Sequence, residues 1–263
     1  MYGDNRTMTD NNLIQWPRAK YWDKCWNPIV GCKPCSPACE HCYARAIMTE
    51  RFNQTFEPHE SNKRTPPRSG VVFCGNMTDL FGEFVEYPQH YIVKAVDAAE
   101  TADAILVLTK RMNRMNQFLR EYGPVRDWLD KGWLHNVYFG FTAENQRWYD
   151  ARHDYIVGRP DAIPKRINHW ISAEPLLGPI HLWMPPAFRA PSWLVVGCES
   201  GPNRRPCKLE WVESIVEQCR AAGVPVFVKQ LNLDGKCVTD INKFPAHLRI
   251  RQVPWNKEND TNG

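Results

Sequence analysis

The chain has 263 residues, 43% of them hydrophobic and 24% charged, which suits one large domain or two small ones. Its net charge of +4 permits an anionic partner but is too mild to indicate nucleic-acid binding alone. No apolar run approaches the roughly 18 residues of a membrane helix, and the start lacks a secretory signal pattern. We therefore expect a cytoplasmic protein without a membrane partner, whose ten cysteines are thiols or metal ligands rather than disulfides.

The order of polar and apolar segments predicts three parts. Residues 1–20 begin with a polar, non-periodic stretch and are expected to form a flexible N-terminal tail. Residues 21–231 are expected to form one α/β domain with a cysteine loop at 26–45. Residues 232–263 are polar and interrupted by proline, and we expect a C-terminal extension there.

The cysteine loop packs Cys32, Cys35, Cys39 and Cys42 into eleven residues. Thiolates are strong ligands for zinc and for iron-sulfur clusters, and closely spaced cysteines can reach one common centre. Cys35-x3-Cys39-x2-Cys42 matches the CxxxCxxC signature of radical S-adenosylmethionine (SAM) enzymes, and Tyr43 follows where that signature often has an aromatic residue. Cys32-x6-Cys39-x2-Cys42 is a second possible ligand set, and all four cysteines would also suit a zinc knuckle or an electron-transfer cluster.

Beyond the loop, short apolar runs alternate with stretches long enough for crossover helices. The expected strands cover residues 70–74, 104–108, 137–141, 167–171, 194–196 and 224–228. The clearest expected helices cover 43–52, 89–101, 111–121 and 210–222. Such alternation predicts a parallel α/β sheet, and six or seven units suggest a full or partial (β/α) barrel similar to a TIM barrel.

In folds of this class the working residues lie at the carboxyl ends of the strands. Polar residues follow each expected strand here, which makes them candidates for a site. They are Asn76, Thr78, Asp79, Lys110, Arg111, Thr142, Glu144, Asn145, Ser172, Glu174, Glu199 and Lys229. A salt-bridge layer that stabilises the sheet is the structural alternative for each charged member of this set.

The chain also resembles a family of radical-SAM-like proteins of phages and prophages that carry a domain of unknown function. The resemblance rests on Trp26-Asn27-Pro28, Gly31-Cys32, Ser36-Pro37-Ala38-Cys39 and Cys42-Tyr43-Ala44, together with the polar blocks after the strands, over about residues 20–230. It implies a barrel of the radical SAM type and a [4Fe-4S] cluster on Cys32, Cys39 and Cys42. If a phage encodes the chain, the expected location is the host cytoplasm.

The resemblance further implies that SAM binds the open iron of the cluster and is cleaved to a 5′-deoxyadenosyl radical that abstracts hydrogen from a substrate. By position, Tyr43, Asn76, Thr78 and Asp79 would lie near the methionyl amino group or the cluster. Thr142, Glu144, Asn145, Ser172 and Glu174 would meet the ribose and the carboxylate, with Lys110 or Arg111 as the paired cation. Glu199 and Lys229 would face the substrate, and an external electron donor is required.

The expected substrate is a nucleotide or a base in nucleic acid, and the reaction class is left open among isomerase, lyase and transferase. One alternative is a zinc- or cluster-stabilised module that binds nucleic acid without turnover. Another is a barrel that keeps its cluster and binds SAM without cleaving it.

Overall fold

The computed structural model describes residues 14–157, 162–184, 190–201 and 203–255. Residues 1–13 and 256–263, which belong to the predicted tail and extension, lie outside the described residues. The main sheet has eight strands in the order β11-β10-β9-β8-β7-β6-β5-β2. They are β2 (Lys24–Trp26), β5 (Val71–Cys74), β6 (Ala104–Thr109), β7 (Val137–Thr142), β8 (Asn168–Ala173), β9 (Trp193–Gly197), β10 (Val226–Leu233) and β11 (Lys236–Val238).

Seven of these strands, from β2 to β10, are parallel, and their spatial order follows the sequence. Strand β11 returns as an antiparallel hairpin partner of β10. The expected α/β class with a parallel sheet is thus confirmed. Among the described residues the sheet ends at β2 on one side and at β11 on the other, with no ladder that joins the two ends, so closure into a barrel stays a prediction.

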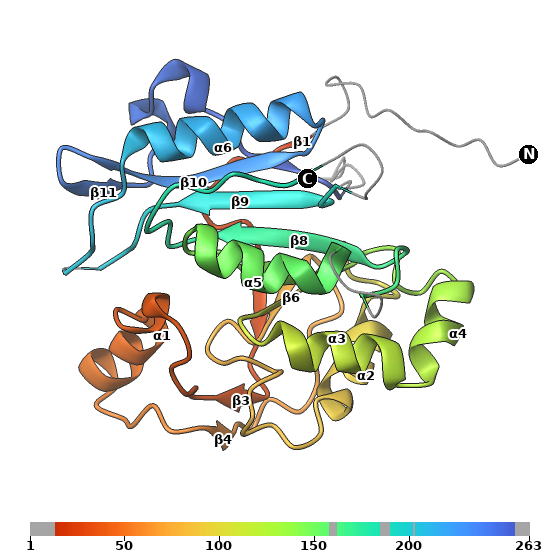
Figure 1. Ribbon diagram of the computed structural model, residues 1–263. Coiled ribbons are helices and arrows are strands. Elements are labelled where there is room, and N and C mark those ends of the chain that lie inside the picture. The colour runs from red at the N-terminus through yellow and green to blue at the C-terminus, as the bar shows by residue number, and fades with distance from the viewer. Residues whose placement is uncertain (1–13, 158–161, 185–189, 202, 256–263) are drawn as a thin grey trace, which may run out of the picture.

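Helices connect the parallel strands and cover one face of the sheet (Figure 1). These helices are α2 (Gln89–Ala98), α3 (Met112–Glu121), α4 (Pro124–Asp130), α5 (Gln146–Val157) and α6 (Leu209–Ala221). The short helix α1 (Tyr43–Ala46) lies apart from them, in the cysteine loop. The helix expected over 43–52 continues from α1 into a π-helical turn, Ile47–Arg51. None of the helices in the described ranges is long and apolar enough to cross a lipid bilayer.

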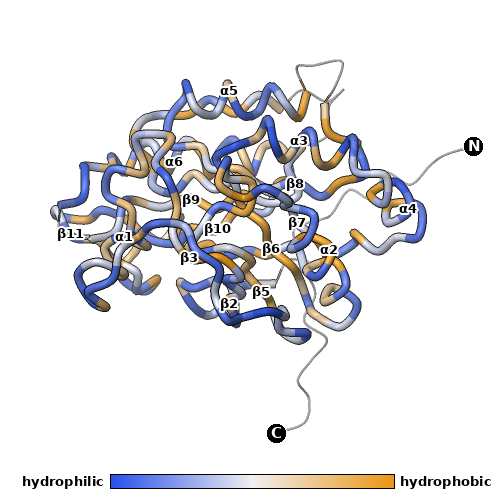
Figure 2. The backbone as a smooth tube through the Cα atoms, turned by 90° about the horizontal axis from the view of Figure 1, so that it is seen from below, coloured by the Kyte–Doolittle hydropathy of each residue, from blue (hydrophilic) through white to orange (hydrophobic). Residues whose placement is uncertain are grey.

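The two faces of the sheet carry different side chains, because successive residues of a strand point to opposite sides. Val72, Ile105 and Leu194 belong to the aliphatic core under the helices. Their neighbours on the other face form what we call the aromatic cluster (Figure 2 shows the hydrophobic strands at the centre). Its members are Trp16, Tyr21, Val71, Phe73, Ala104, Leu106, Tyr138, Trp170, Trp193, Val195, Phe227, Val253 and Trp255.

Tyr21 connects distant strands across this inner face. Its ring lies 6.1 Å from the Phe73 ring on β5, 5.0 Å from Trp193 on β9 and 5.5 Å from Phe227 on β10, measured between centroids. One buried residue that precedes β2 therefore contacts both halves of the sheet, so the inner face is concave enough for side chains from β5 and β10 to meet at the same ring.

Two small sheets lie outside the main one. Strand β1 (Ile14–Gln15) pairs with β12 (Gln252–Val253), and β3 (Ile29–Val30) pairs with β4 (His59–Glu60). The first pair lies within the predicted tail and extension. Residues 14–20 thus belong to the fold rather than to a flexible tail, and Trp16 is buried in the aromatic cluster.

Candidate functional site

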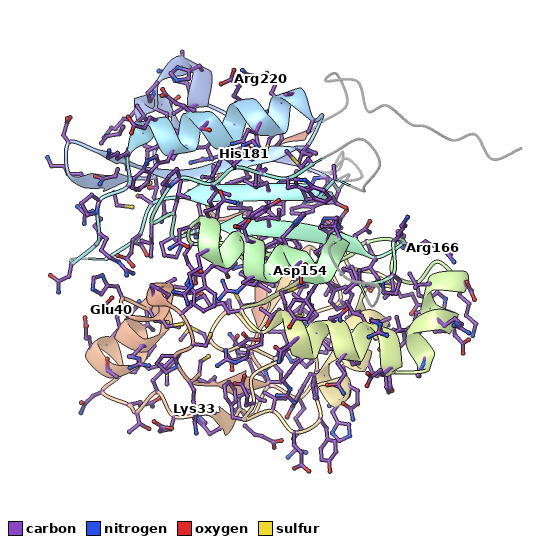
Figure 3. All side chains as sticks on the ribbon, in the orientation of Figure 1. Lys33, Glu40, Asp154, Arg166, His181 and Arg220 are labelled. Carbon is purple, nitrogen blue, oxygen red and sulfur yellow. The ribbon has the colours of Figure 1, made fainter. Side chains whose placement is uncertain are left out.

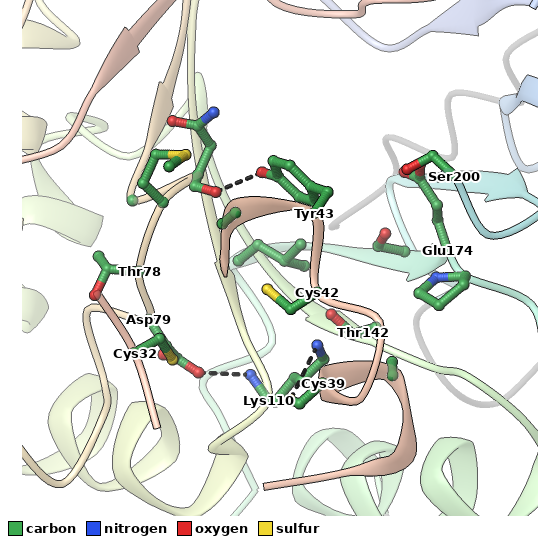
Figure 4. A pocket seen from close by; sticks show the side chains of 18 of the residues that line it. Cys32, Cys39, Cys42, Tyr43, Thr78, Asp79, Lys110, Thr142, Glu174 and Ser200 are labelled. Carbon is green, nitrogen blue, oxygen red and sulfur yellow. Dashed lines mark hydrogen bonds between the residues drawn. The ribbon is translucent and has the colours of Figure 1, made fainter. Parts of the chain in front are cut away.

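A pocket lies where the carboxyl ends of β5 to β10 meet the cysteine loop that follows β2 (Figure 4). Its empty space is about 1030 Å³, a volume that includes the part open to solvent. The structure brings most of the polar residues that follow the strands together with three cysteines of the loop. Of the residues expected in the site, the pocket is lined by Cys32, Cys39, Cys42, Tyr43, Asn76, Thr78, Asp79, Lys110, Arg111, Thr142, Ser172, Glu174, Glu199 and Lys229.

The four clustered cysteines divide into two groups in this site. Cys32, Cys39 and Cys42 line the pocket, whereas Cys35 is not among its lining residues. Cys32 and Cys42 also pack against a small apolar cluster of Ala44, Met48 and Phe56. Of the two possible ligand sets, the structure thus presents Cys32, Cys39 and Cys42 together to one space.

Two cations from the start of α3 lie against the sulfur atoms of this loop. Lys110 Nζ is 3.6 Å from Cys39 Sγ, and Arg111 Nη1 is 4.0 Å from Cys32 Sγ. A hydrogen bond from Cys35 lowers the pKa of the Cys39 thiol, burial opposes the shift, and Lys110 adds to it. Burial raises the pKa of Cys32 to about 11, with Asp79 adding to the shift and Arg111 opposing it. These shifts favour a thiolate at Cys39, beside Lys110, and a neutral thiol at Cys32.

Asp79 connects the loop after β5 to the end of β6, because its carboxylate accepts hydrogen bonds from several protein groups. It accepts from the Thr109 hydroxyl at 2.7 Å, from the Lys110 backbone N–H at 3.0 Å and from Arg111 Nη1 at 3.1 Å. Arg111 also donates to Glu83 at 2.6 Å and to the Lys33 carbonyl at 2.8 Å. This buried ion pair fixes the base of the pocket and attaches the cysteine loop to it.

Asn27 holds the loop after β5 in place. Its Nδ2 donates to Asn76 Oδ1 at 2.8 Å, and its Oδ1 accepts from the Met77 backbone N–H at 3.0 Å. The hydroxyl of Tyr43 donates to the Asn76 carbonyl, and that of Thr78 donates to the Gly31 carbonyl at 2.6 Å. Asn76, Thr78 and Tyr43 therefore line the pocket while they also connect it to the cysteine loop.

Glu144 and Asn145 are the two predicted site residues that do not line the pocket. Glu144 is fully buried, pairs with Arg152 at 2.8 Å and accepts a hydrogen bond from the Ser36 hydroxyl. Asn145 Oδ1 accepts from the Trp148 backbone N–H at 3.3 Å at the start of α5. In this structure both residues brace the site: Glu144 links α5 to the cysteine loop, and Asn145 caps a helix.

Glu174 and Lys229 form an ion pair on the far wall of the pocket. Lys229 Nζ lies 2.5 Å from Glu174 Oε1, and the two side chains are 20% and 15% exposed. The same ammonium lies 5.7 Å from the centroid of the Tyr21 ring and 5.6 Å from that of Trp22. A planar or anionic ligand in this part of the pocket would therefore meet aromatic faces and a cation together.

Glu199 connects the cysteine loop to the loop after β9. Its Oε2 lies 3.0 Å from His41 Nδ1 and accepts from the Arg205 backbone N–H at 2.8 Å. Arg205 also pairs with Glu199 Oε1 and, at 3.2 Å, with Glu40, which Figure 3 labels at the surface of the cysteine loop. Burial favours the neutral acid, but these hydrogen bonds outweigh it and hold the pKa of Glu199 below its usual value.

Several residues of the site were missed from the sequence. Asn27 directly follows β2, so the rule for strand ends would have selected it had it been applied to that short strand. Tyr21 and Trp22 precede a strand and carry no such signal. Cys198 lines the pocket beside Glu199, although its spacing to other cysteines suggests no ligand role.

The chain matches the family described as protein of unknown function (DUF5131) over residues 17–244, and it belongs to this family. No curated protein and no solved structure matches it. Within the described ranges, no three His, Cys, Asp or Glu side chains are close enough together to hold a metal ion as they stand. Thiolates are ligands of iron-sulfur clusters, and three thiols line this pocket beside two cations.

Proposed function

We propose that this protein is a radical SAM enzyme whose cluster is held by Cys32, Cys39 and Cys42. The observation that carries the proposal is the convergence of these three thiols with the carboxyl ends of six parallel strands in one pocket, from which Cys35 is left out. Three thiolates leave one iron of a [4Fe-4S] cluster without a protein ligand, and the amino and carboxylate groups of SAM can occupy it. Bound together, the two cofactors supply a 5′-deoxyadenosyl radical.

The sheet supports this proposal through its consecutive strand order. In our proposal the seven parallel strands form a partial barrel, with the cysteine loop across its mouth. Lys110 and Arg111 compensate the thiolate charge, and the base formed by Asp79 keeps them in position. Thr142 and Ser172, from the ends of β7 and β8, present hydroxyl-bearing side chains to the pocket where a ribose or a carboxylate would lie.

For the substrate we propose a nucleotide or a base in nucleic acid. Support comes from the wall formed by Trp22, which is only partly buried, and Lys229, because aromatic faces stack on bases and an ammonium attracts phosphate. Glu174 sets the position of Lys229 through their ion pair. An external donor supplies the electron. Hydrogen abstraction from the substrate is the common first step, whichever rearrangement, loss or transfer follows it.

The test is anaerobic reconstitution with iron and sulfide, followed by reduction and addition of SAM. We expect an EPR signal of the reduced cluster that changes when SAM is added, and release of 5′-deoxyadenosine. Bound zinc in place of iron, or a cluster indifferent to SAM, would instead support a nucleic-acid-binding module. A signal that responds to SAM without deoxyadenosine release would identify a protein that binds SAM but does not cleave it.

Matched cysteine variants test the ligand assignment. Cys39→Ala removes a thiol that lines the pocket, and we expect it to lose the cluster and all deoxyadenosine formation. Cys35→Ala removes a thiol of the same loop that does not line the pocket, and we expect the cluster to remain. Cluster loss in Cys35→Ala together with retention in Cys32→Ala would show that the first ligand is Cys35.

A further inference from the structure

Two cysteines outside the cysteine loop face one another at the pocket wall. Cys198 follows β9, is fully buried and lines the pocket. Cys237 lies in β11, at the antiparallel hairpin after β10, and is partly exposed. Their sulfur atoms are 3.7 Å apart, although 39 positions separate them in the sequence. Nothing in the proposed function uses either thiol.

The backbone holds both partners in register. The N–H of Cys198 donates to the Gln230 carbonyl at 3.2 Å, and Gln230 Nε2 donates to the Cys198 carbonyl at 2.6 Å. On the other side, Cys237 pairs with Asn232 in the β10–β11 ladder. Both residues are therefore held by contacts with strand β10, and these contacts place the two thiols next to one another. Bonded sulfurs are about 2.05 Å apart, so the bond requires the two sulfurs, 3.7 Å apart in this structure, to move closer together.

The charges around the pair favour reaction at Cys237. A hydrogen bond from Cys198 lowers the pKa of the Cys237 thiol to about 7; burial opposes this, and Arg204 acts in the same direction as the hydrogen bond. Arg204 is fixed near the hairpin, because it donates to the Gly201 carbonyl at 2.8 Å and to that of Gly235. Lys229 also favours the thiolate, whereas Glu174 opposes it. A partly exposed thiolate next to a buried thiol is the arrangement of an attacking and a resolving cysteine.

We propose that Cys198 and Cys237 form a reversible disulfide that links the pocket wall to the β10–β11 hairpin. The oxidant is a low-molecular-weight disulfide. The Cys237 thiolate attacks one of its sulfurs and releases one thiolate, which gives a mixed disulfide. The Cys198 thiol then loses its proton, displaces the second small thiolate and completes the internal bond. Two protein thiols are oxidised and one small disulfide is reduced to two thiols.

Peptide mapping tests this pair directly in the full-length protein, before and after cluster loading. Buffers with increasing ratios of oxidised to reduced glutathione are followed by alkylation, tryptic digestion and mass spectrometry. Cys198, Cys207 and Cys237 fall on three different peptides, 190–204, 205–208 and 237–243. We expect a linked 190–204/237–243 product that grows with the ratio and disappears on reduction. Its absence at every ratio, or a 190–204/205–208 product in its place, would overturn the proposal.

Two variants separate the roles of the partners. Cys198→Ala removes the resolving thiol, so Cys237 should accumulate as the mixed disulfide with glutathione. Cys237→Ser removes the attacking thiol, so buried Cys198 should stay reduced in the same buffers. Cys207→Ala, at a neighbouring buried thiol, is the control and should leave the linked product unchanged. Equal reactivity of Cys198 in wild type and in Cys237→Ser would contradict the assigned order. Because the mapping reads no cluster signal, its outcome is independent of SAM cleavage.

Discussion

The aromatic cluster and the pocket share the inner face of the same strands and differ in almost every other property. On β8, Trp170 is fully buried in the cluster, and Ser172 two residues later lines the pocket. On β10, Phe227 belongs to the cluster, and Lys229 lines the pocket at a position where the register with β9 shifts. A step of two residues keeps a side chain on the same face of a strand. The change from apolar to polar along these two strands therefore divides one face into a packed half and a half that lines the pocket.

Packed apolar side chains and polar pocket side chains are thus separated along the strands rather than between different strands. The packed half contains interlocked rings, such as Trp170 and Trp193 with centroids 5.2 Å apart. The other half contains ion pairs and hydrogen bonds whose partners come from distant loops. We therefore expect substitutions in the packed half to change mainly the free energy of unfolding, and substitutions in the pocket to change mainly ligand chemistry.

The largest effect on stability is expected for Trp170→Ala. The indole is fully buried and donates to the carbonyls of Val107 and Tyr138, both at 3.2 Å. Truncation leaves a large cavity, and we expect a loss of about 3–5 kcal/mol in the free energy of unfolding, measured by urea denaturation. Trp183→Ala, at a side chain that is 44% exposed, is the control and should cost far less. An equal loss of unfolding free energy in the two variants would show that packing in the aromatic cluster does not contribute more to stability than an exposed side chain.

A smaller loss of unfolding free energy is expected when an atom is added next to the Trp170 ring. A Cβ added at Gly140 would lie 2.4 Å from the Trp170 ring, so Gly140→Ala forces the ring or β7 to move. We expect a loss of about 1–3 kcal/mol in the free energy of unfolding. Gly123→Ala is the matched control, because no atom lies within 4 Å of its added Cβ. A neutral Gly140→Ala would mean that the ring can shift without cost.

The fold was largely predictable because strand and helix periodicities are local properties of the sequence. The run 167–171 predicted β8 (Asn168–Ala173), and the run 104–108 predicted β6 (Ala104–Thr109). The sequence did not indicate that Ile14–Gln15 pairs with Gln252–Val253, because pairing between residues more than 230 positions apart depends on the whole fold. For the same reason the sequence predicts a flexible tail over residues 14–20, whereas in the structure Trp16 is buried.

The lining of the site was predictable for a similar reason, whereas the partners of its residues were not. The rule that polar residues follow parallel strands identifies positions such as Thr142 and Ser172 without knowledge of the tertiary structure. This rule cannot show that Glu144 pairs with Arg152 on α5. Glu144 therefore connects α5 to the cysteine loop instead of lining the pocket. Nor can the rule show that Cys237, in a hairpin after the last parallel strand, meets Cys198. Such pairs depend on how loops from different strands pack against one another.

In the pocket, the ion pair of Lys229 and Glu174 should couple by about 1 kcal/mol in a double-mutant cycle with Lys229→Met and Glu174→Gln. The pair is only 20% and 15% exposed, so solvent screens it less than a surface pair. Unfolding free energies of the four proteins give the coupling. The matched control is the pair of Lys208 and Glu210, 3.5 Å apart with side chains 63% and 68% exposed, which should couple by only a few tenths of a kcal/mol.

Lys229→Met also tests whether this wall contacts the proposed substrate. We expect Lys229→Met to keep the cluster and its EPR response to SAM but to reduce turnover of a nucleotide substrate, because it removes the cation at Tyr21 and Trp22. Unchanged turnover in Lys229→Met would place the substrate elsewhere in the pocket.

The smallest effect is expected in the pH dependence of stability that Glu199 contributes. Hydrogen bonds from Arg205 and His41 lower its pKa in the folded state against the opposing effect of burial. Between the lowered pKa of Glu199 in the folded state and its ordinary pKa of 4.5, the unfolded chain binds more protons at this group, so stability rises with pH in that window. The contribution of Glu199 is complete above pH 4.5 and is lost as the pH falls through the folded pKa.

Glu199→Gln removes this titration and leaves a similar shape. The difference in unfolding free energy between wild type and Glu199→Gln should therefore be constant near neutral pH and shrink as the pH falls below about 4.5. His41→Ala should give an intermediate result, because Arg205 still donates from its backbone and side chain. Urea unfolding of the three proteins from about pH 7 to about pH 4 measures this. A difference that grows as the pH falls would show that burial, and not the hydrogen bonds, dominates at Glu199, and that this corner of the pocket resembles the packed half.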